Sequence, residues 1–289
     1  MHDLDFLEPT SVAEASRMAV DLGEDARFIA GGTALMLALR QRLLGPCTLV
    51  SLARLDALRG ISVDAQGQLH SGALSLHAQV AESDSVLKHS PVLAHMASQV
   101  ANPQVRNQGT LGGNLCYADP ATDPACCLLA LDARIVLVSF RGKRELPLNE
   151  FLVDYFTTAI EPDELVHEII VPPACANVRA SYARFLRTPA EHRPMVSVAA
   201  RVQVDHGVCT TATIVIGAAV AVASRAKAAE LCLAGQAPSL ERIYEAAATA
   251  AASITPLDDL RGSEAYRRQM VQVQVKRTLA QLFELNLEG

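Results

Sequence analysis

The N-terminal segment alternates helical and extended patterns of apolar residues. Ser11 and Glu14 have the spacing of a capping box, which predicts a helix that begins there and ends at Gly23. Arg27–Ala30 is a short apolar run typical of a strand, and it leads directly into Gly31–Gly32. This strand is therefore expected to end at a turn formed by Gly31 and Gly32, which have no side chains.

A second helical pattern follows this turn, with a leucine at every fourth position from Leu35 to Leu43. Gly45–Pro46 is expected to end that helix, because proline cannot continue one. Thr48–Leu52 has the pattern of a returning strand. Together these segments predict a compact β–loop–α–β unit.

The middle of the chain contains two hairpin patterns, in which apolar and polar residues alternate around a glycine. They cover Gly60–Ala73 and Ala133–Leu148. A helix is expected from about residue 84 to residue 100, and His167–Pro173 is a strand ended by two prolines. Gln104–Pro124 has no period, and a loop this long inside a compact domain usually has a function.

Long strand patterns begin to dominate the sequence near residue 177. Met195–Val204 and Cys209–Ala218 are strongly apolar, and Asp205–His206–Gly207 joins them as a turn. Alanine-rich helices follow, with caps at Ser239 and Ser263. One face of the last helix carries large apolar residues, namely Val271, Val275, Leu279 and Leu282.

These patterns predict an α+β protein of two domains, a number that 289 residues readily accommodate. We expect one domain at residues 1–176, with subdomains at about 1–55 and 56–176. A smaller C-terminal domain at 177–289 is expected to combine an antiparallel sheet with helices. Half of the residues are hydrophobic, which suffices for a sizeable core.

Charge and hydropathy argue against two classes of partner. The net charge is −6, whereas a nucleic-acid binder needs a basic face. Ile214–Ala223 is the best candidate for a membrane span and has about half of the roughly 20 apolar residues required. Residues 1–10 lack the basic start and apolar run of a signal peptide. We expect a cytoplasmic protein with no direct membrane insertion, unless a partner carries an export signal.

The seven cysteines are expected to be reduced, buried thiols. No CxxC pair occurs, and an odd number does not fit a disulfide framework. Cys116, Cys126 and Cys127 are close enough in sequence to suggest a metal or iron–sulfur site, but their spacing matches no zinc or ferredoxin pattern. No metal site is predicted.

Two glycine pairs carry the strongest candidate chemistry, Gly31–Gly32 and Gly112–Gly113. The common nucleotide motifs GxGxxG and GxxxxGK[ST] are both absent. A diphosphate needs several backbone N–H groups at close range, and glycine removes the side chains that would obstruct them. Thr33 and Thr110 can each add a hydroxyl donor. Either pair alone is more simply a tight turn, but two in one chain make a dinucleotide site an equal alternative.

Asp119 and Asp123 follow the second pair. Their carboxylates could accept hydrogen bonds from ribose hydroxyls or an adenine amine. Asp119–Pro120 is also a common way to begin a turn, which is the simpler interpretation of Asp119. Nothing nearby completes an acid–base site, so no catalytic residue is predicted. Three histidines are expected to be structural or exposed, namely His77, His95 and His192.

Two motifs resemble those of a known family. AGGTAL at residues 30–35 and VRNQGTLGGNLCYADPATDP at residues 105–124 are similar to the FAD-binding medium subunits of the molybdenum hydroxylases. That family includes the carbon monoxide dehydrogenase flavoprotein, the flavin domain of xanthine dehydrogenase and 4-hydroxybenzoyl-CoA reductase. The second motif is highly specific and the first moderately so. The likeness covers nearly the whole chain, including SYARFLRTPAEHRPMVSVAARV at residues 181–202.

The resemblance implies a two-subdomain FAD-binding domain of the vanillyl-alcohol oxidase-like (PCMH) type, followed by the family's C-terminal domain. Asp123 matches a position beside the adenosine half of FAD. Leu165 or Val166, and Met195, match positions near the flavin ring. The residues implied around the diphosphate are Ile29, Ala30, Gly31, Gly32, Thr33, Ala34 and Leu35, together with Thr110, Gly112, Gly113 and Asn114.

The chain departs from the family's pattern at three points. Many members have His-Ser where this chain has Thr33–Ala34, which affects the side-chain contacts of the first turn and not its backbone contacts. Met195 is uncharged where xanthine dehydrogenase places a cation near the flavin, and Arg193 or Arg187 is a candidate substitute. The cysteine-bearing insertion of the benzoyl-CoA-type enzyme is absent, so FAD alone is predicted.

The resemblance also implies partners. These are a molybdopterin-containing large subunit and a small subunit with [2Fe–2S] clusters, assembled as a dimer of heterotrimers. FAD on this chain would collect electrons from the clusters and pass them to NAD⁺, oxygen or a quinone. Two alternatives stay open: a stand-alone FAD-dependent oxidoreductase of the same fold, and a non-catalytic nucleotide-binding assembly protein.

Overall fold

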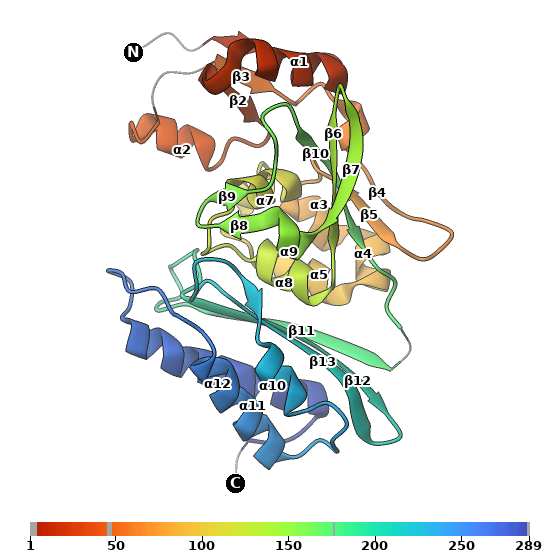
Figure 1. Cartoon of the computed structure of the whole chain (residues 1–289), viewed down its shortest axis with the longest axis vertical. Helices are drawn as coiled ribbons and strands as arrows, with labels where there is room; N and C mark the ends of the chain where they lie inside the picture. Colours follow the sequence, from red (N-terminus) through yellow and green to blue (C-terminus); the bar gives the residue numbers. More distant parts are fainter. Residues whose placement is uncertain (1–4, 45–47, 176, 288–289) are drawn as a thin grey trace.

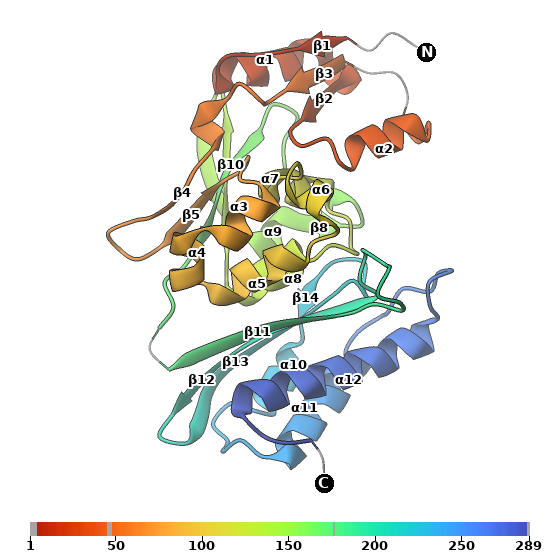
Figure 2. The ribbon, with the colours of Figure 1, turned by 180° about the vertical axis from the view of Figure 1, so that it is seen from behind.

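The computed structural model describes residues 5–44, 48–175 and 177–287, and its elements stack in three tiers (Figures 1 and 2). A small sheet with α1 forms one end, a five-stranded sheet with short helices forms the middle, and a four-stranded sheet with three helices forms the C-terminal end. The mixture of helices and mainly antiparallel sheets confirms the predicted α+β class. Among the described residues, no helix is both long enough and apolar enough to cross a bilayer.

The first tier contains the predicted β–loop–α–β unit and one additional strand. Its parallel sheet has the order β1–β3–β2, and α1 packs against it. The α1 cap is as predicted, because Ser11 Oγ accepts a hydrogen bond from Glu14 N at 3.2 Å and Gly23 ends the helix. The bounds are Phe6–Leu7 for β1, Val12–Leu22 for α1, Ala26–Ile29 for β2, Leu35–Arg40 for α2 and Thr48–Ser51 for β3.

Helix α2 is shorter than its leucine pattern predicts. It ends at Arg40, and Arg42 adopts a left-handed φ of 57° that a continuing helix does not allow. Leu43 is 72 % exposed, so it does not extend the apolar face. The stop expected at Gly45–Pro46 lies outside the described residues. The pattern predicted the helix correctly and its length wrongly.

The middle tier is built on an antiparallel sheet of order β4–β5–β10–β6–β7. Both predicted hairpins are confirmed, since β4 pairs with β5 and β6 pairs with β7. Strand β10, expected from residue 167, begins at Leu165 and lies between the hairpins. In sheet order the strands are Ile61–Val63, Leu69–Gly72, Leu165–Val171, Arg134–Ser139 and Gly142–Pro147.

Short helices occupy the regions where one long helix and a loop were expected. The expected helix is broken at Ser90, whose φ of −149° and ψ of 68° are not helical, and Pro91 begins a new helix. The aperiodic stretch also contains helices, and the second glycine pair lies in the first turn of one of them, α7. The helices are α3 His77–Glu82, α4 Asp84–His89, α5 Pro91–Gln99, α6 Pro103–Arg106, α7 Leu111–Tyr117, α8 Pro124–Ala130 and α9 Leu148–Phe151. The small hairpin of β8 Leu152–Asp154 and β9 Thr157–Thr158 completes the tier.

The C-terminal tier has a four-stranded antiparallel sheet of order β11–β12–β13–β14. The predicted strand pair and helix caps are confirmed: Ser239 Oγ accepts from Arg242 N, and Ser263 Oγ accepts from Tyr266 N. The strands are β11 Val178–Phe185, β12 Val196–Asp205, β13 Val208–Gly217 and β14 Ser224–Arg225. The helices are α10 Lys227–Leu231, α11 Leu240–Ala252 and α12 Glu264–Phe283.

Both faces of this sheet are covered. Helices α10 and α12 pack against one face, and α5 and α8 of the middle tier pack against the other (Figures 1 and 2). Ala199 and Val215 belong to the hydrophobic cluster of the middle tier, whereas Val198 and Ile216 belong to the C-terminal cluster. Burial of both faces explains why these strands contain runs of consecutive apolar residues, such as residues 214–216.

Candidate cofactor site

The two glycine turns meet in space although they are far apart in the sequence. A Cβ added to Gly31 would lie 2.1 Å from the carbonyl oxygen of Gln108, so the two backbones touch where a side chain would be. A Cβ on Gly109 would lie 3.4 Å from Thr33 Oγ1, and one on Gly113 would lie 3.8 Å from the Ala30 Cβ. At Gly31 only a residue without a side chain permits this approach.

The first turn leaves a run of backbone amides unpaired. Within the described part of the chain, the N–H groups of residues 30–34 donate to no acceptor, and helical bonding begins with Met36 N to Gly32 O at 2.9 Å. All five residues are partly exposed. Gly32 has a φ of +68°, which glycine adopts without strain. Successive unpaired amides form a site suited to an anionic group such as a diphosphate.

The second turn uses its own amides to hold its shape. Gly112 N donates to the Ala73 carbonyl oxygen at 2.9 Å, and Gly113 N donates to Thr110 Oγ1 at 3.1 Å. A Cβ on Gly112 would lie 2.6 Å from the Ala73 Cβ, so this glycine is required for packing. Asn114 Oδ1 is buried and has no partner among the described residues. This turn contributes shape, the Thr110 hydroxyl hydrogen and one unsatisfied amide oxygen.

His77 lies next to Gly109 at the contact between the two glycine turns, a position that no sequence pattern predicted. It is 2 % exposed, its backbone N donates to Gly109 O at 3.1 Å, and its Nδ1 has no partner in the described residues. Burial, together with the charge of Arg106, lowers the pKa of His77 to about 4. The ring is therefore neutral at pH 7. Gly109 and Ala73 also line the contact between the two glycine turns, and only the first glycine of the motif QGTLGG signals that role in the sequence.

Asp123 connects the middle tier to the C-terminal sheet. It precedes α8, and its Oδ1 accepts a hydrogen bond from Tyr182 Oη at 2.5 Å. Arg184 Nη1 lies 3.3 Å from its Oδ2, and both partners belong to β11. Burial raises the pKa of the Asp123 carboxyl to about 6, and the opposing effects of Arg184 and Tyr182 are smaller. Contact between Asp123 and the adenosine half of FAD stays a prediction.

Asp119 makes the turn that its Asp-Pro sequence predicts and a second contact that it does not. Its Oδ1 accepts from Ala121 N at 2.9 Å, which is the turn. Arg193 Nη2, which belongs to the C-terminal tier, also donates to Oδ1 at 2.6 Å. Arg193 lies in the loop between β11 and β12, so this ion pair is a second link between the middle tier and the C-terminal tier.

Met195 and Leu165 lie inside hydrophobic clusters and not in the two glycine turns. Met195 is 0 % exposed in the C-terminal cluster, and Leu165 is 2 % exposed in the cluster beneath α1. Neither side chain is open to a ligand in this packing. The position of Met195 near the flavin ring stays a prediction, and in this packing its thioether is enclosed. Leu165 can contribute only through its backbone.

The cysteines considered for a metal site are separated by the fold. Cys126 and Cys127 are buried on α8, where their thiols donate to the carbonyl oxygens of Val215 at 3.5 Å and Val92 at 3.8 Å. Cys116 is exposed on α7. Across the described ranges, no group of three or more His, Cys, Asp or Glu residues is arranged to hold a metal ion. Cys47 lies outside those ranges.

The residues where the two glycine turns meet fit FAD. The amides of residues 30–34, which have no acceptor in the described residues, suit the diphosphate. The turn at residues 108–113 contains three glycines and leaves room for it. The unsatisfied Asn114 Oδ1 offers an acceptor that FAD can use. This donor set is that of a site which holds a dinucleotide through backbone contacts.

Comparison with known proteins agrees with this site. The family described as the FAD binding domain in molybdopterin dehydrogenase matches residues 2–174, and the CO dehydrogenase flavoprotein C-terminal domain matches residues 180–282. Subunit alpha of the 6-hydroxypseudooxynicotine dehydrogenase complex of Paenarthrobacter nicotinovorans is 35% identical over 277 residues, which cover 96% of this chain and 93% of that protein.

Two solved structures have the same fold over almost the whole chain. Carbon monoxide dehydrogenase from Hydrogenophaga pseudoflava, in a form lacking the Mo-pyranopterin moiety of its molybdenum cofactor, superposes with a TM-score of 0.94 at 31% identity and covers 97% of both chains. Quinoline 2-oxidoreductase from Pseudomonas putida 86 superposes with a TM-score of 0.92 at 28% identity, covering 98% of this chain and 97% of that chain.

We expect Gly31→Ala to weaken FAD binding by at least about tenfold, because the new Cβ overlaps the Gln108 carbonyl and no side-chain rotation relieves the clash. The measurement is the FAD dissociation constant by fluorescence titration. Gly207→Ala is the control: this hairpin glycine has φ +78° and open space around it, so the variant loses stability but keeps its FAD affinity. Wild-type affinity in Gly31→Ala would contradict the assignment.

We expect Asp123→Asn to gain stability relative to the wild type as the pH rises from about 4 to 7. The folded-state pKa of about 6 exceeds the ordinary value of 3.8, so the folded wild type binds more protons in this window and loses stability as the pH rises. Asparagine does not titrate. The measurement is the melting temperature of each protein against pH.

Asp163→Asn is the control for this profile. Its hydrogen bonds with Arg141 lower the pKa of Asp163 below 3.8, so this carboxyl is ionised in both states above pH 5. The difference between Asp163→Asn and the wild type should therefore stay constant between pH 5 and 7. A constant difference for Asp123→Asn over the same range would show that its carboxyl is not shifted.

Proposed function

This chain belongs to the family of FAD-binding subunits of molybdopterin dehydrogenases, and from that premise we propose its role. It is the electron-transfer subunit of a heterotrimeric molybdenum hydroxylase, accepting electrons from [2Fe–2S] clusters of a partner and passing them to NAD⁺, oxygen or a quinone. FAD supplies the redox chemistry, and the protein supplies binding and orientation. The observation that carries the proposal is the run of unpaired amides at residues 30–34 against the second glycine turn.

In this proposal the first turn, Ile29 to Leu35, surrounds the diphosphate, and its backbone amides are the donors. Thr110, Gly112, Gly113 and Asn114 form the opposite wall. Asp123 lies toward the adenosine half, while the backbone at Leu165 and the loop ending at Met195 lie toward the flavin ring. Electron transfer requires no general base or nucleophile from this chain, so these residues bind and orient.

We propose the same division of labour for the domains. Residues 1–176 bind FAD, with subdomains at about 1–55 and 56–176 that each contribute one glycine turn. Residues 177–289 form the C-terminal flavoprotein domain. What supports this division is that the hydrophobic cluster built on α10 to α12 draws its residues from position 195 onward.

The names of the relatives support partners for this chain. One relative is a subunit of a dehydrogenase complex, and the carbon monoxide dehydrogenase of the same fold was solved in a form that lacks the Mo-pyranopterin moiety of its molybdenum cofactor. We propose a molybdopterin-containing large subunit and a [2Fe–2S] small subunit, in a dimer of heterotrimers. A donor cluster must approach the flavin, so apolar surface near the glycine turns is a candidate interface.

Such a surface exists at the far end of α7. Tyr117, Tyr155 and Phe156 are 39–51 % exposed, and their rings stack edge to face with centroids 4.7 and 5.2 Å apart. Phe156 N donates to Ala118 O at 3.2 Å, which fixes the β8–β9 hairpin against α7. Helix α7 begins at the second glycine turn and is only about 10 Å long, so this aromatic cluster lies close to the proposed site. We propose that it contacts the iron–sulfur partner.

Purification of the tagged chain from cells that also express its partners tests the proposed role. We expect a yellow complex with one FAD per chain, molybdenum and iron in the same fraction, and flavin that is reduced by the substrate of the complex. Acceptor identity follows from reoxidation with NAD⁺, oxygen or a quinone. A chain without flavin would favour the non-catalytic alternative. A flavin-loaded chain that turns over alone would favour the stand-alone oxidoreductase.

We expect the double variant Tyr155→Ser/Phe156→Ser to weaken association with the iron–sulfur subunit by about tenfold or more, because exposed aromatic residues dominate interface energetics. Pull-down and interaction calorimetry measure this. Phe140→Ser is the control, since Phe140 is 43 % exposed on the β6–β7 turn, away from α7. Equal binding by the wild type and the double variant, with FAD retained, would place the interface elsewhere.

A further inference from the structure

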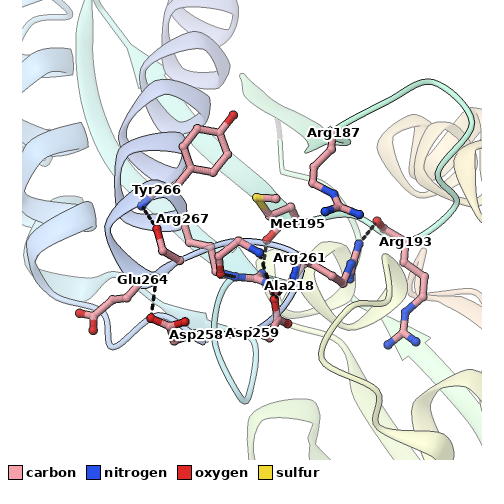
Figure 3. Close-up of polar contacts among 12 residues, drawn as sticks. Arg187, Arg193, Met195, Ala218, Asp258, Asp259, Arg261, Glu264, Tyr266 and Arg267 are labelled. Atoms are coloured by element: carbon pink, nitrogen blue, oxygen red, sulfur yellow. Dashed lines mark hydrogen bonds and ion pairs between the residues drawn. The ribbon is translucent and has the colours of Figure 1, made fainter.

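A buried arginine on α12 is bonded to three separate segments. Arg267 is 1 % exposed, although arginine is almost never fully buried unless it is paired. Its Nη1 donates to the carbonyl oxygens of Met195 at 2.8 Å and Ala218 at 3.0 Å (Figure 3). Its Nε donates to Gly262 O at 3.3 Å, and its Nη2 donates to Asp259 Oδ1 at 2.7 Å. One guanidinium therefore joins the segments around residues 195, 218 and 262.

A second arginine holds the same segment before β12. Arg261 Nη2 donates to the carbonyl oxygen of Arg193 and, at 3.3 Å, to that of Pro194 (Figure 3). The three consecutive carbonyl groups of residues 193–195 thus accept hydrogen bonds from two guanidinium groups. Gly262 also packs here, since an added Cβ would lie 2.9 Å from the Met195 Cε.

The segment held in this way reaches the flavin-binding part of the chain through Arg193. Its guanidinium donates to both carboxylate oxygens of Asp119, at 2.6 and 2.5 Å. Asp119 follows α7, the helix that begins at the second glycine turn. Arg187 and Glu191 close the same loop, with Nε to Oε1 at 2.8 Å. A continuous set of polar contacts therefore runs from α12, through residues 193–195, to the segment that follows α7.

We propose that Arg267 is a positioning residue that, with Arg261, sets where residues 193–195 lie against the flavin-binding part of the chain. It touches no cofactor and acts through Arg193 and Asp119. The effect on FAD rests on the proposed function, because it requires that the neighbouring turns bind FAD. A buried ionic group is a weak way to stabilise a core, since apolar residues of similar volume often do as well or better. Four acceptors on three segments instead specify one arrangement of the backbone.

The first test needs no cofactor and uses hydrogen exchange in the full chain. In Arg267→Met, we expect the amides of residues 186–195 to exchange faster by about tenfold or more, while α11 and α12 stay protected. Arg261→Gln is a milder second variant and should act on the same residues. Arg268→Met is the matched control, because Arg268 donates to Ala251 O at 2.6 Å and Ile254 O at 3.0 Å and so holds the end of α11.

The second test couples Arg267 to Arg193. We expect Arg267→Met and Arg193→Gln each to raise the FAD dissociation constant by about tenfold, and the double variant to bind no more weakly than the weaker single variant. A lower melting temperature with unchanged exchange and unchanged FAD affinity would overturn the proposal, as would fully additive effects. If the wild type binds no FAD while exchange responds as described, the positioning role stands and the proposed function fails.

Discussion

Backbone contact between two distant turns, at Gly31 and Gln108, is the constraint on which the proposed cofactor site depends. Because Gly31 has no side chain, its turn lies directly against the Gln108 carbonyl, and the amides of residues 30–34 have no acceptor within the described parts of the chain. Such groups are satisfied in proteins by secondary structure, by side chains or by water, and here the partial exposure of the turn lets water take that place. A diphosphate that replaces this water gains several converging donors at once. Backbone shape, more than side-chain chemistry, makes the site.

The segment that forms the second turn also joins the tiers. Residues 108–113 contact the first turn, and Asp119 and Asp123 follow within the same stretch and bind Arg193 and β11. A change in the position of the C-terminal tier is therefore transmitted to the wall of the cofactor site through a short length of chain. This arrangement is compatible with the proposed role, in which the flavin keeps a fixed position between an electron donor and an electron acceptor.

A shifted pKa at Asp123 does not make it a catalytic acid. Perturbed carboxyls often mark active sites, because burial and nearby charges are how enzymes tune them. Here the same burial comes from packing α8 against the C-terminal sheet, and the partners Tyr182 and Arg184 satisfy the carboxylate in place. The raised pKa reflects the free-energy cost of a charged carboxylate that is buried between the middle tier and the C-terminal sheet. This agrees with a chain whose role is to bind and orient FAD.

The sequence by itself predicted most of the local secondary structure along the chain. Helix caps, hairpins and glycine motifs depend on residues that are neighbours in the sequence, as at Ser11, Ser239 and Ser263. The glycine motifs were specific enough to imply FAD. Tertiary structure alone decided that Gly112 donates to Ala73, that Met195 is enclosed, and that Arg193 pairs with Asp119. It also decided the helix at Leu111, since packing holds such short helices. Sequence patterns record which residues prefer burial and which backbone shapes are allowed, but they do not record which distant segment provides the partner.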